Sequence, residues 1–350
     1  MKKVTVSASK TYDILIERKI LKSCGEYIKS IGISNCKVAI LTDDTVDTLY
    51  SDVVISSLEK CGFYVIKYVI DHGEDSKCAK NFIGFLNFLA ENQMTRSDIL
   101  IALGGGVVGD LCGFCASAYL RGVKFIQIPT TLLSMVDSSV GGKTAINLDS
   151  GKNLAGAFYQ PSLVLIDPDT LDTLPPETFA DGCAEVIKYG IINDKPLFDK
   201  LLDGIENNLE DIIENCVKNK RDIVNIDERD TGVRQLLNLG HTIGHAVEHL
   251  SGFDISHGSA VAIGTVAISK ISCFLGFMSC DEVKLIEKIF EKYCLPTICP
   301  YSADEICEVS LSDKKREGGH INLVIPYSIG DSRLMRVETS SLFDIFSRGV

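Results

Sequence analysis

The chain has 350 residues, enough for a large hydrophobic core and most consistent with two domains, because single cores stop growing near ~250–300 residues. Its formal net charge of −12 argues against a protein that binds nucleic acid or anionic membranes, although clustered Lys and Arg can still make one cleft positive. No uninterrupted apolar run approaches the ~18 residues of a membrane span, and residues 1–20 lack the apolar core of a signal peptide. We therefore expect a cytoplasmic protein.

The thirteen cysteines are odd in number and scattered through apolar segments, which favours buried thiols over a framework of disulfides. Cys112 and Cys115 form a CxxC pair, but they lie in an apolar helical pattern without the strand–helix–strand context of a thioredoxin-like site. We expect no redox role for them.

The first half of the chain alternates short β-branched runs with amphipathic stretches. Residues 1–20 predict a surface strand. Further strands are predicted at residues 37–44, 63–70, 98–106, 125–131 and 163–168, with a helix over 78–93. This alternation predicts a parallel sheet with crossover helices.

A glycine-rich loop follows the strand predicted at 98–106. Gly104, Gly106 and Gly109 match GxGxxG, in which backbone N–H groups approach a pyrophosphate at the start of the next helix. The simple Rossmann fingerprint also needs an acidic residue about twenty positions later, and none is present. The loop therefore predicts a variant nucleotide site, and tight-turn glycines without a ligand are the alternative.

Residues 129–153 form a polar stretch with few core-forming residues, and we expect a loop there. Asp137, Lys143, Lys152 and Asn153 lie in it among Gly, Ser and Thr. Lysines in such a setting suit phosphate or carboxylate oxygens, whereas the alternative is a solvated linker.

A boundary is predicted at Pro175–Pro176, which divides the chain into domains at residues 1–175 and 176–350. From Pro176 to about Ile298 the periodicity is helical nearly throughout, and residues 321–338 return to short strands. The expected fold class is α/β plus all-α: a Rossmann-like parallel-sheet domain followed by a mainly helical domain.

Four of the six histidines fall within seventeen residues, and His241, His245 and His249 are spaced four apart. Helical spacing would place His241 and His245 on one stripe, so this pair is the metal site that the spacing favours. Two imidazoles and one carboxylate form a catalytic zinc arrangement, and Glu185 is the candidate carboxylate because HExxH is absent. The alternative for Glu185 is a salt bridge to Lys188, three residues on.

Six motifs together resemble the 3-dehydroquinate synthase family. They are GGGVVGD (104–110), RGVKFIQIPTTLLSMVDSSVGGKTAIN (121–147), GKNLAGAFYQP (151–161), DGCAEVIKYGII (181–192), DERDTGVRQLLNLGHTIGHAVE (227–248) and SHGSAVAIG (256–264). The resemblance implies a homodimer with an NAD domain and a helical metal domain. It also implies NAD-dependent conversion of 3-deoxy-D-arabino-heptulosonate 7-phosphate to 3-dehydroquinate, with loss of phosphate, in the shikimate pathway to chorismate and the aromatic amino acids.

The resemblance also implies roles for single residues. It places a divalent metal, zinc or cobalt, on Glu185, His241 and His257, which replaces the His241–His245 pair that helical spacing favours. His245 then becomes a residue that handles protons next to the substrate, and His249 a residue of the helix surface.

The implied contacts with NAD, substrate and reacting groups are more numerous. The NAD contacts are Asp43, Glu74, Lys77, Gly105, Gly106, Val107, Asp110, Thr130, Thr131, Asp137, Lys143, Lys152, Thr170 and Thr173. The substrate contacts are Asp137, Lys143, Lys152, Asn153, Lys188, Lys220, Arg234, Asn238, His245 and Lys314, with Arg121 supplied by the partner subunit. The catalytic group is His245, Lys152, Lys188, Asn153 and Glu185. Spacing does not separate Lys314 from the adjacent Lys315.

Two other enzyme classes remain as alternatives. One is another sugar phosphate cyclase, acting on sedoheptulose 7-phosphate, glucose 6-phosphate or an aminated substrate. The other is a metal- and NAD-dependent alcohol dehydrogenase of related fold, which would release NADH instead of using it again.

Overall fold

The computed structural model describes residues 1–314 and 319–350, and the side chains of 312–314 lie outside that description. It divides into two compact units. The first consists of residues 1–174 and 220–229, and the second of residues 175–219 and 230–350. The helix α8 (Leu209–Ile226) passes from the second unit into the first, so the chain leaves the first unit near Pro175 and returns to it for ten residues.

The first unit is built on a seven-stranded sheet of order β1-β2-β9-β6-β5-β3-β4. Its strands are β1 (Lys2–Ser7), β2 (Thr11–Ile16), β3 (Lys37–Asp43), β4 (Tyr64–Ile70), β5 (Ile99–Gly104), β6 (Lys124–Pro129) and β9 (Leu163–Ile166). Only β1 pairs antiparallel, with β2, and the remaining neighbours are parallel. The strands expected from the sequence are therefore present, and residues 1–20 supply two of them.

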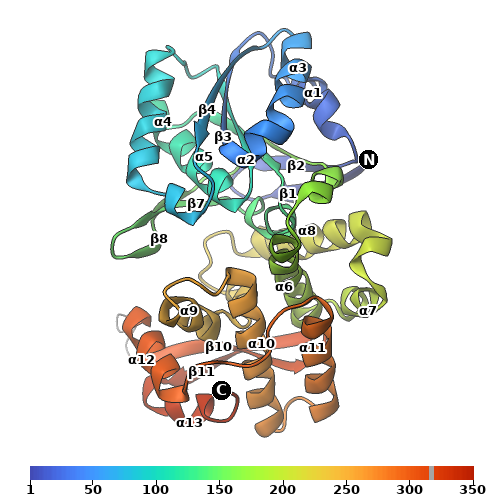
Figure 1. The fold of residues 1–350 in the computed structure, drawn as a ribbon, viewed down its shortest axis with the longest axis vertical. Coiled ribbons are helices and arrows are strands. Elements are labelled where there is room, and N and C mark those ends of the chain that lie inside the picture. The colour runs from blue at the N-terminus through green and yellow to red at the C-terminus, as the bar shows by residue number, and fades with distance from the viewer. Residues whose placement is uncertain (315–318) are drawn as a thin grey trace. The chain divides into compact units, whose positions relative to one another are not determined.

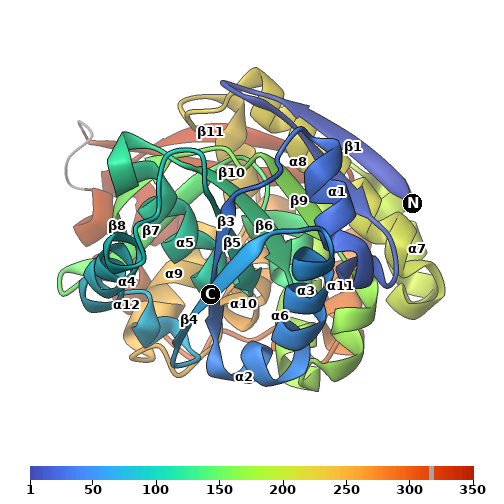
Figure 2. The same cartoon turned by 90° about the horizontal axis from the view of Figure 1, so that it is seen from above.

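Helices cover both faces of this sheet (Figures 1 and 2). They are α1 (Cys24–Ser30), α2 (Asp44–Val46), α3 (Asp52–Lys60), α4 (Ala79–Glu91) and α5 (Gly106–Ala118). Val38 and Ile40 of β3 pack in the core with α1 and α3, whereas Ala39 and Leu41 pack with α4 and α5. Because successive strand side chains point to opposite faces, a sheet covered on both sides needs continuous apolar strands, as this sequence has.

The polar stretch at residues 129–153 differs from the expected loop. Its last part, residues 143–153, lies in a hairpin of β7 (Lys143–Leu148) and β8 (Gly151–Phe158), and Lys143 pairs with Phe158 while Leu148 pairs with Gly151. The Thr144 and Ile146 side chains of β7 are buried, and this alternate burial explains the strand. Lys143 therefore lies at the base of the hairpin and Lys152 near its turn, about 13 Å away at ~3.3 Å per residue.

The second unit is mainly helical. Its helices are α6 (Pro176–Ile192), α7 (Lys195–Asp203), the first part of α8, α9 (His241–Leu250), α10 (His257–Phe274), α11 (Cys280–Lys292), α12 (Ala303–Lys314) and α13 (Leu342–Phe346). The hairpin of β10 (His320–Ser328) and β11 (Asp331–Glu338) accounts for the strands predicted at 321–338. The predicted α/β plus all-α fold class is confirmed.

Helix α10 forms the core of the second unit. By length and composition it is apolar enough to cross a membrane, but 72% of it is buried inside the structure, as in a core helix. Gly264 of α10 allows the start of α9 to approach closely, because a Cβ at Gly264 would lie only 2.0 Å from the carbonyl oxygen of Gly240, the residue before α9. Gly240 itself has φ +78°, so this junction needs glycine on both sides.

The cysteines follow the sequence prediction in part: six are buried, whereas Cys294 is exposed and Cys36, Cys61, Cys78 and Cys299 are partly buried. Cys273 and Cys280, at the α10–α11 connection, form a disulfide with a Cα–Cα distance of 5.7 Å, and the other eleven cysteines are not disulfide-bonded. Cys112 and Cys115 are buried in α5, and burial raises the pKa of both thiols, which makes them unreactive.

Asp98 provides a test of how β5 is held. Its buried carboxylate accepts hydrogen bonds from the backbone N–H groups of Lys37 at 2.7 Å and Thr95 at 2.6 Å. We predict that Asp98→Ala lowers the free energy of unfolding by about 1–3 kcal/mol, because two partly buried hydrogen bonds lose their acceptor. Urea denaturation measures this, and Asp71→Ala at an exposed position should change it by less than about 0.5 kcal/mol.

Candidate active site

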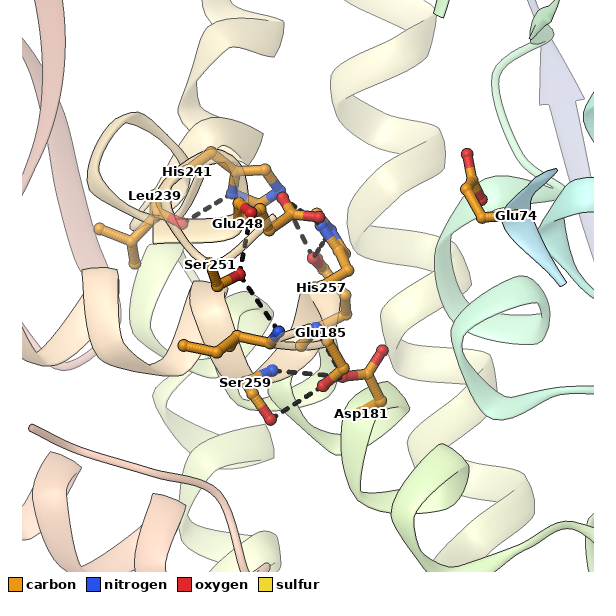
Figure 3. A network of polar contacts seen from close by, with 12 residues as sticks. Glu74, Asp181, Glu185, Leu239, His241, Glu248, Ser251, His257 and Ser259 are labelled. Atoms are coloured by element: carbon orange, nitrogen blue, oxygen red, sulfur yellow. Dashed lines mark hydrogen bonds and ion pairs between the residues drawn. The ribbon is translucent and has the colours of Figure 1, made fainter. Parts of the chain in front are cut away.

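Three side chains from three helices of the second unit converge on one point. Glu185 comes from the middle of α6, and His241 and His257 are the first residues of α9 and α10. Glu185 Oε1 lies 3.5 Å from His241 Nε2 and 3.3 Å from His257 Nε2, and the three ligand atoms all lie within 4.8 Å of one another (Figure 3). The structure thus brings together the three residues on which the family resemblance places the metal.

The outer nitrogens of both histidines face oxygen atoms. His241 Nδ1 lies 3.0 Å from the Leu239 carbonyl oxygen, and His257 Nδ1 lies 3.3 Å from Glu248 Oε2. Because those oxygens only accept, each Nδ1 carries the hydrogen in a neutral imidazole, and each Nε2 lone pair faces Glu185. Ligating histidines are oriented by this kind of outer bond.

The carboxylate of Glu185 is fully buried, and neither oxygen accepts a hydrogen bond of good geometry from the described residues. Two Nε2 lone pairs and one carboxylate oxygen that face each other need a cation or a proton between them. A divalent metal with two imidazole ligands and one carboxylate ligand fits this donor set, with a position left for substrate.

The charges around the three residues agree with a cation-binding site. Burial alone would lower the pKa of His257, but the carboxylates of Glu185 and Glu248 outweigh it and raise that pKa to about 10. Burial alone would raise the pKa of Glu185, but Lys188 and the two histidines hold it well below its usual value. A bound metal would therefore take the place of the His257 proton.

Lys188 and His245 border this group. The Lys188 ammonium forms an ion pair with Glu185 Oε2, one helical turn along α6, and both side chains are buried. The salt bridge considered from sequence is thus present, while Glu185 Oε1 still faces the imidazoles. His245 is exposed, and its ring centre lies 5.3 Å from that of His241 and 6.1 Å from that of His257.

Sequence reasoning missed Glu248 and Asp181. Glu248 lies two helical turns after His241 on the same side of α9 and joins His245 and His257 in a second group of possible ligands. The seven-residue spacing between His241 and Glu248 could have indicated that both face the same side of the helix. His249 is exposed and its ring contacts Phe253, as expected of a residue on the helix surface.

The first unit places the residues proposed for NAD at the carboxyl ends of neighbouring strands. β5 ends at Gly104, α5 starts at Gly106, and a Cβ on Gly105 would lie 3.1 Å from the Thr131 side chain. Thr130 follows β6, and its N–H donates to the Gly104 carbonyl at 3.1 Å. These glycines leave the start of α5, including Val107, open to an approaching phosphate.

Acidic residues lie on both sides of this loop. Asp43 ends β3, caps α2 by accepting from Val46 N at 2.8 Å, and has its pKa raised by burial. Asp110 of α5 pairs with Lys77 at 2.6 Å, and burial outweighs Lys77 to raise the pKa of Asp110. Lys77 lies 4.0 Å from Glu74.

The remaining proposed contacts of the first unit are spread along the sheet edge and the hairpin. Asp137 pairs with Lys220 at 2.5 Å, and the Thr170 carbonyl and Thr173 hydroxyl both bind the Tyr50 hydroxyl.

Asn153 has φ +59° and donates its N–H to the Asn147 side chain at 2.9 Å. The structure does not bring Lys143 and Lys152 side by side, because they lie at opposite ends of the hairpin.

Two proposed substrate residues of the second unit lie outside the metal-ligand group. Arg234 is buried and Asn238 is exposed, both in the turn at Val233–Asn238 that leads into α9. Lys314 ends α12, but its side chain lies outside the described part of the chain, and Lys315 lies outside the described residues altogether.

Known proteins match the whole chain. The 3-dehydroquinate synthase N-terminal family model matches residues 67–181 and the C-terminal family model residues 182–316. A 3-dehydroquinate synthase of Streptococcus suis is 44% identical over 98% of this chain and 99% of its own length. One of Clostridium botulinum is 45% identical over 95% and 97%. The chain belongs to the 3-dehydroquinate synthase family.

Solved structures share this fold. A 2-epi-5-epi-valiolone synthase from Streptomyces hygroscopicus with NAD+ and Zn2+ has a TM-score of 0.86 at 26% identity, covering 98% of this chain and 97% of that one. A 2-deoxy-scyllo-inosose synthase with carbaglucose-6-phosphate, NAD+ and Co2+ has a TM-score of 0.86 at 22% identity, and the match covers both chains fully. The NADH-dependent butanol dehydrogenase A of Thermotoga maritima has a TM-score of 0.68 at 16% identity, covering 96% of each chain, which is a likeness of fold alone.

Replacing His241 tests the metal site. We predict that His241→Ala weakens Zn2+ binding by more than about 100-fold. Removing a residue that only hydrogen bonds to a metal ligand typically lowers metal affinity about 10–100-fold, and removing the ligand itself should lower it more. Calorimetric titration of the metal-stripped protein measures this. His249→Ala, on the exposed side of the same helix, is the control, and equal affinities in the two variants would contradict the assignment.

Proposed function

We propose that the chain is an NAD- and metal-dependent lyase that converts 3-deoxy-D-arabino-heptulosonate 7-phosphate to 3-dehydroquinate and phosphate. The steps are oxidation of a ring hydroxyl, elimination of phosphate, re-reduction, ring opening and aldol cyclisation. The observation that carries the proposal is the convergence of Glu185, His241 and His257 in a chain 41–45% identical to 3-dehydroquinate synthases over nearly its full length.

The metal would be held by Glu185 Oε1 and the two Nε2 atoms, and it would supply Lewis acidity to an alcohol and then to its carbonyl. The positive charge of Lys188 pairs with the second oxygen of Glu185, and this ion pair lets the buried carboxylate remain anionic. His245 is exposed beside the other imidazoles, where it can move a proton at a substrate hydroxyl.

NAD would be held by the first unit, and it would accept and return a hydride in one turnover. The pyrophosphate would meet the N–H groups of Gly105, Gly106 and Val107 at the start of α5, and Asp43 at the end of β3 would bind ribose hydroxyls. Lys77 orients Asp110 through their 2.6 Å ion pair. Thr130, Thr131, Thr170 and Thr173 follow β6 and β9 and therefore lie at the same sheet edge.

Positively charged side chains would bind the anionic substrate. Lys143, Lys152 and Lys220 come from the first unit, and Lys188 and Arg234 from the second. Such groups offset the phosphate and carboxylate charges in a chain of net charge −12. Asn153 and Asn238 would hydrogen bond to substrate hydroxyls, and Asp137 is held in place by Lys220.

A homodimer is part of the proposal because of Arg121. This exposed residue, with φ +65°, precedes β6, whereas Thr130 follows β6 at the opposite edge of the sheet. One protomer therefore presents Arg121 away from its own glycine loop, where it could serve a partner. The cytoplasmic location expected from sequence is retained in the proposal.

Phosphate release provides the activity test. We predict phosphate formation from 3-deoxy-D-arabino-heptulosonate 7-phosphate with catalytic amounts of NAD and no net NADH absorbance, because the cofactor is reoxidised in each turnover. Activity should disappear after chelation and return with Zn2+ or Co2+. Faster phosphate release from sedoheptulose 7-phosphate or glucose 6-phosphate would favour another cyclase, and NADH accumulation would favour a dehydrogenase.

A further inference from the structure

The start of α10 is capped by a residue from a different helix. The first N–H groups of a helix lack partners within it, and the side chain of Ser256, at the N-cap of α10, does not supply one. Asp181 of α6 does so instead. Its Oδ1 accepts from Gly258 N at 2.6 Å, Ser259 N at 3.2 Å and Ser256 Oγ at 2.5 Å (Figure 3).

This cap joins the two helices that carry Glu185 and His257. Asp181 and Glu185 are four residues apart on α6 and therefore face the same side, and His257 lies between Ser256 and Gly258. A Cβ on Gly258 would lie 2.2 Å from the Asp181 carbonyl oxygen, so the two backbones are in direct contact there. The separation of α6 and α10 next to the metal-ligand group is fixed by this contact.

We infer that Asp181 is a positioning residue for the metal site: by capping α10 from α6, it fixes the His257 imidazole where Nε2 and Glu185 Oε1 can share one cation. This inference rests on the proposed metal-binding function. Asp181 touches neither the metal nor the substrate in this role. It acts through His257, because a displacement of α10 would change the 3.3 Å separation between His257 Nε2 and Glu185 Oε1.

An ordinary helix cap provides the comparison. Asp194 caps α7 in the same unit, and its Oδ1 accepts from Leu197 N at 3.0 Å, away from the metal-ligand group. Loss of either cap destabilises a helix, but only Asp181 links a capped helix to Glu185. Asp194→Ala is therefore the matched control for Asp181→Ala.

Cobalt binding distinguishes positioning from stability. The full-length protein is stripped of metal and titrated with Co2+, and the visible absorption bands report both affinity and ligand geometry. We expect Asp181→Ala to weaken Co2+ binding by about 10–100-fold and to change the band intensities. Asp181→Asn should stay within about threefold of the unchanged protein, because its amide oxygen can accept the same three bonds. Asp194→Ala should lower the melting temperature and leave Co2+ affinity unchanged.

Each result has one meaning. Asp181→Ala with unchanged Co2+ affinity and a lowered melting temperature would overturn the positioning role and leave only a cap. If Asp181→Ala fails to fold, Asp181→Asn still decides, since a loss of affinity in the folded Asn variant would overturn the geometric explanation. If the unchanged protein binds no Co2+, the metal site of the proposed function fails first, and the inference fails with it.

Discussion

The buried carboxylate of Glu185 is the constraint on which the second unit depends. An isolated carboxylate without contact to water costs several kcal/mol, so its neighbours must supply positive charge or donors. Lys188 provides one such charge on one oxygen, and the two imidazoles face the other. The arrangement is balanced only when a proton or a metal lies between them. The buried charge of Glu185 would destabilise the protein without a cation nearby, and the same charge gives the site its affinity for a cation.

Backbone packing makes that convergence possible. His241 and His257 are both first residues of helices, so their positions depend on where α9 and α10 begin and how closely they approach. Gly240 and Gly264 allow contact at a distance that any side chain would prevent. Asp181 and Glu248 then fix the start of α10 and the outer nitrogen of His257. Small residues set the separation, and carboxylates set the orientation.

Periodicity and motif spacing predicted the fold better than the site. Continuous apolar strands indicated a sheet covered on both faces because burial is a local property of each strand. The metal ligands were different: helical spacing favoured His241 with His245, whereas His257 comes from another helix, and only the family resemblance pointed to it. Residues 129–153 were predicted as a polar loop, although residues 143–153 lie in the hairpin, because the buried face of β7 is provided by Thr144 and Ile146 among polar neighbours. Asp181 had no sequence signal, since its partners lie 75–78 positions away.

The fold alone does not select the reaction. Cyclases at 22–26% identity and a dehydrogenase at 16% identity share the architecture, so the chemistry must be decided by the residues that the fold presents. A dehydrogenase needs a cofactor and a metal, but it has no leaving phosphate to bind. This chain places lysines on the β7–β8 hairpin, on α6 and on α8 although its net charge is −12. An anionic substrate requires positively charged side chains, and in the proposed function these lysines would provide them, which would separate a phosphate-eliminating cyclase from an alcohol dehydrogenase of the same fold.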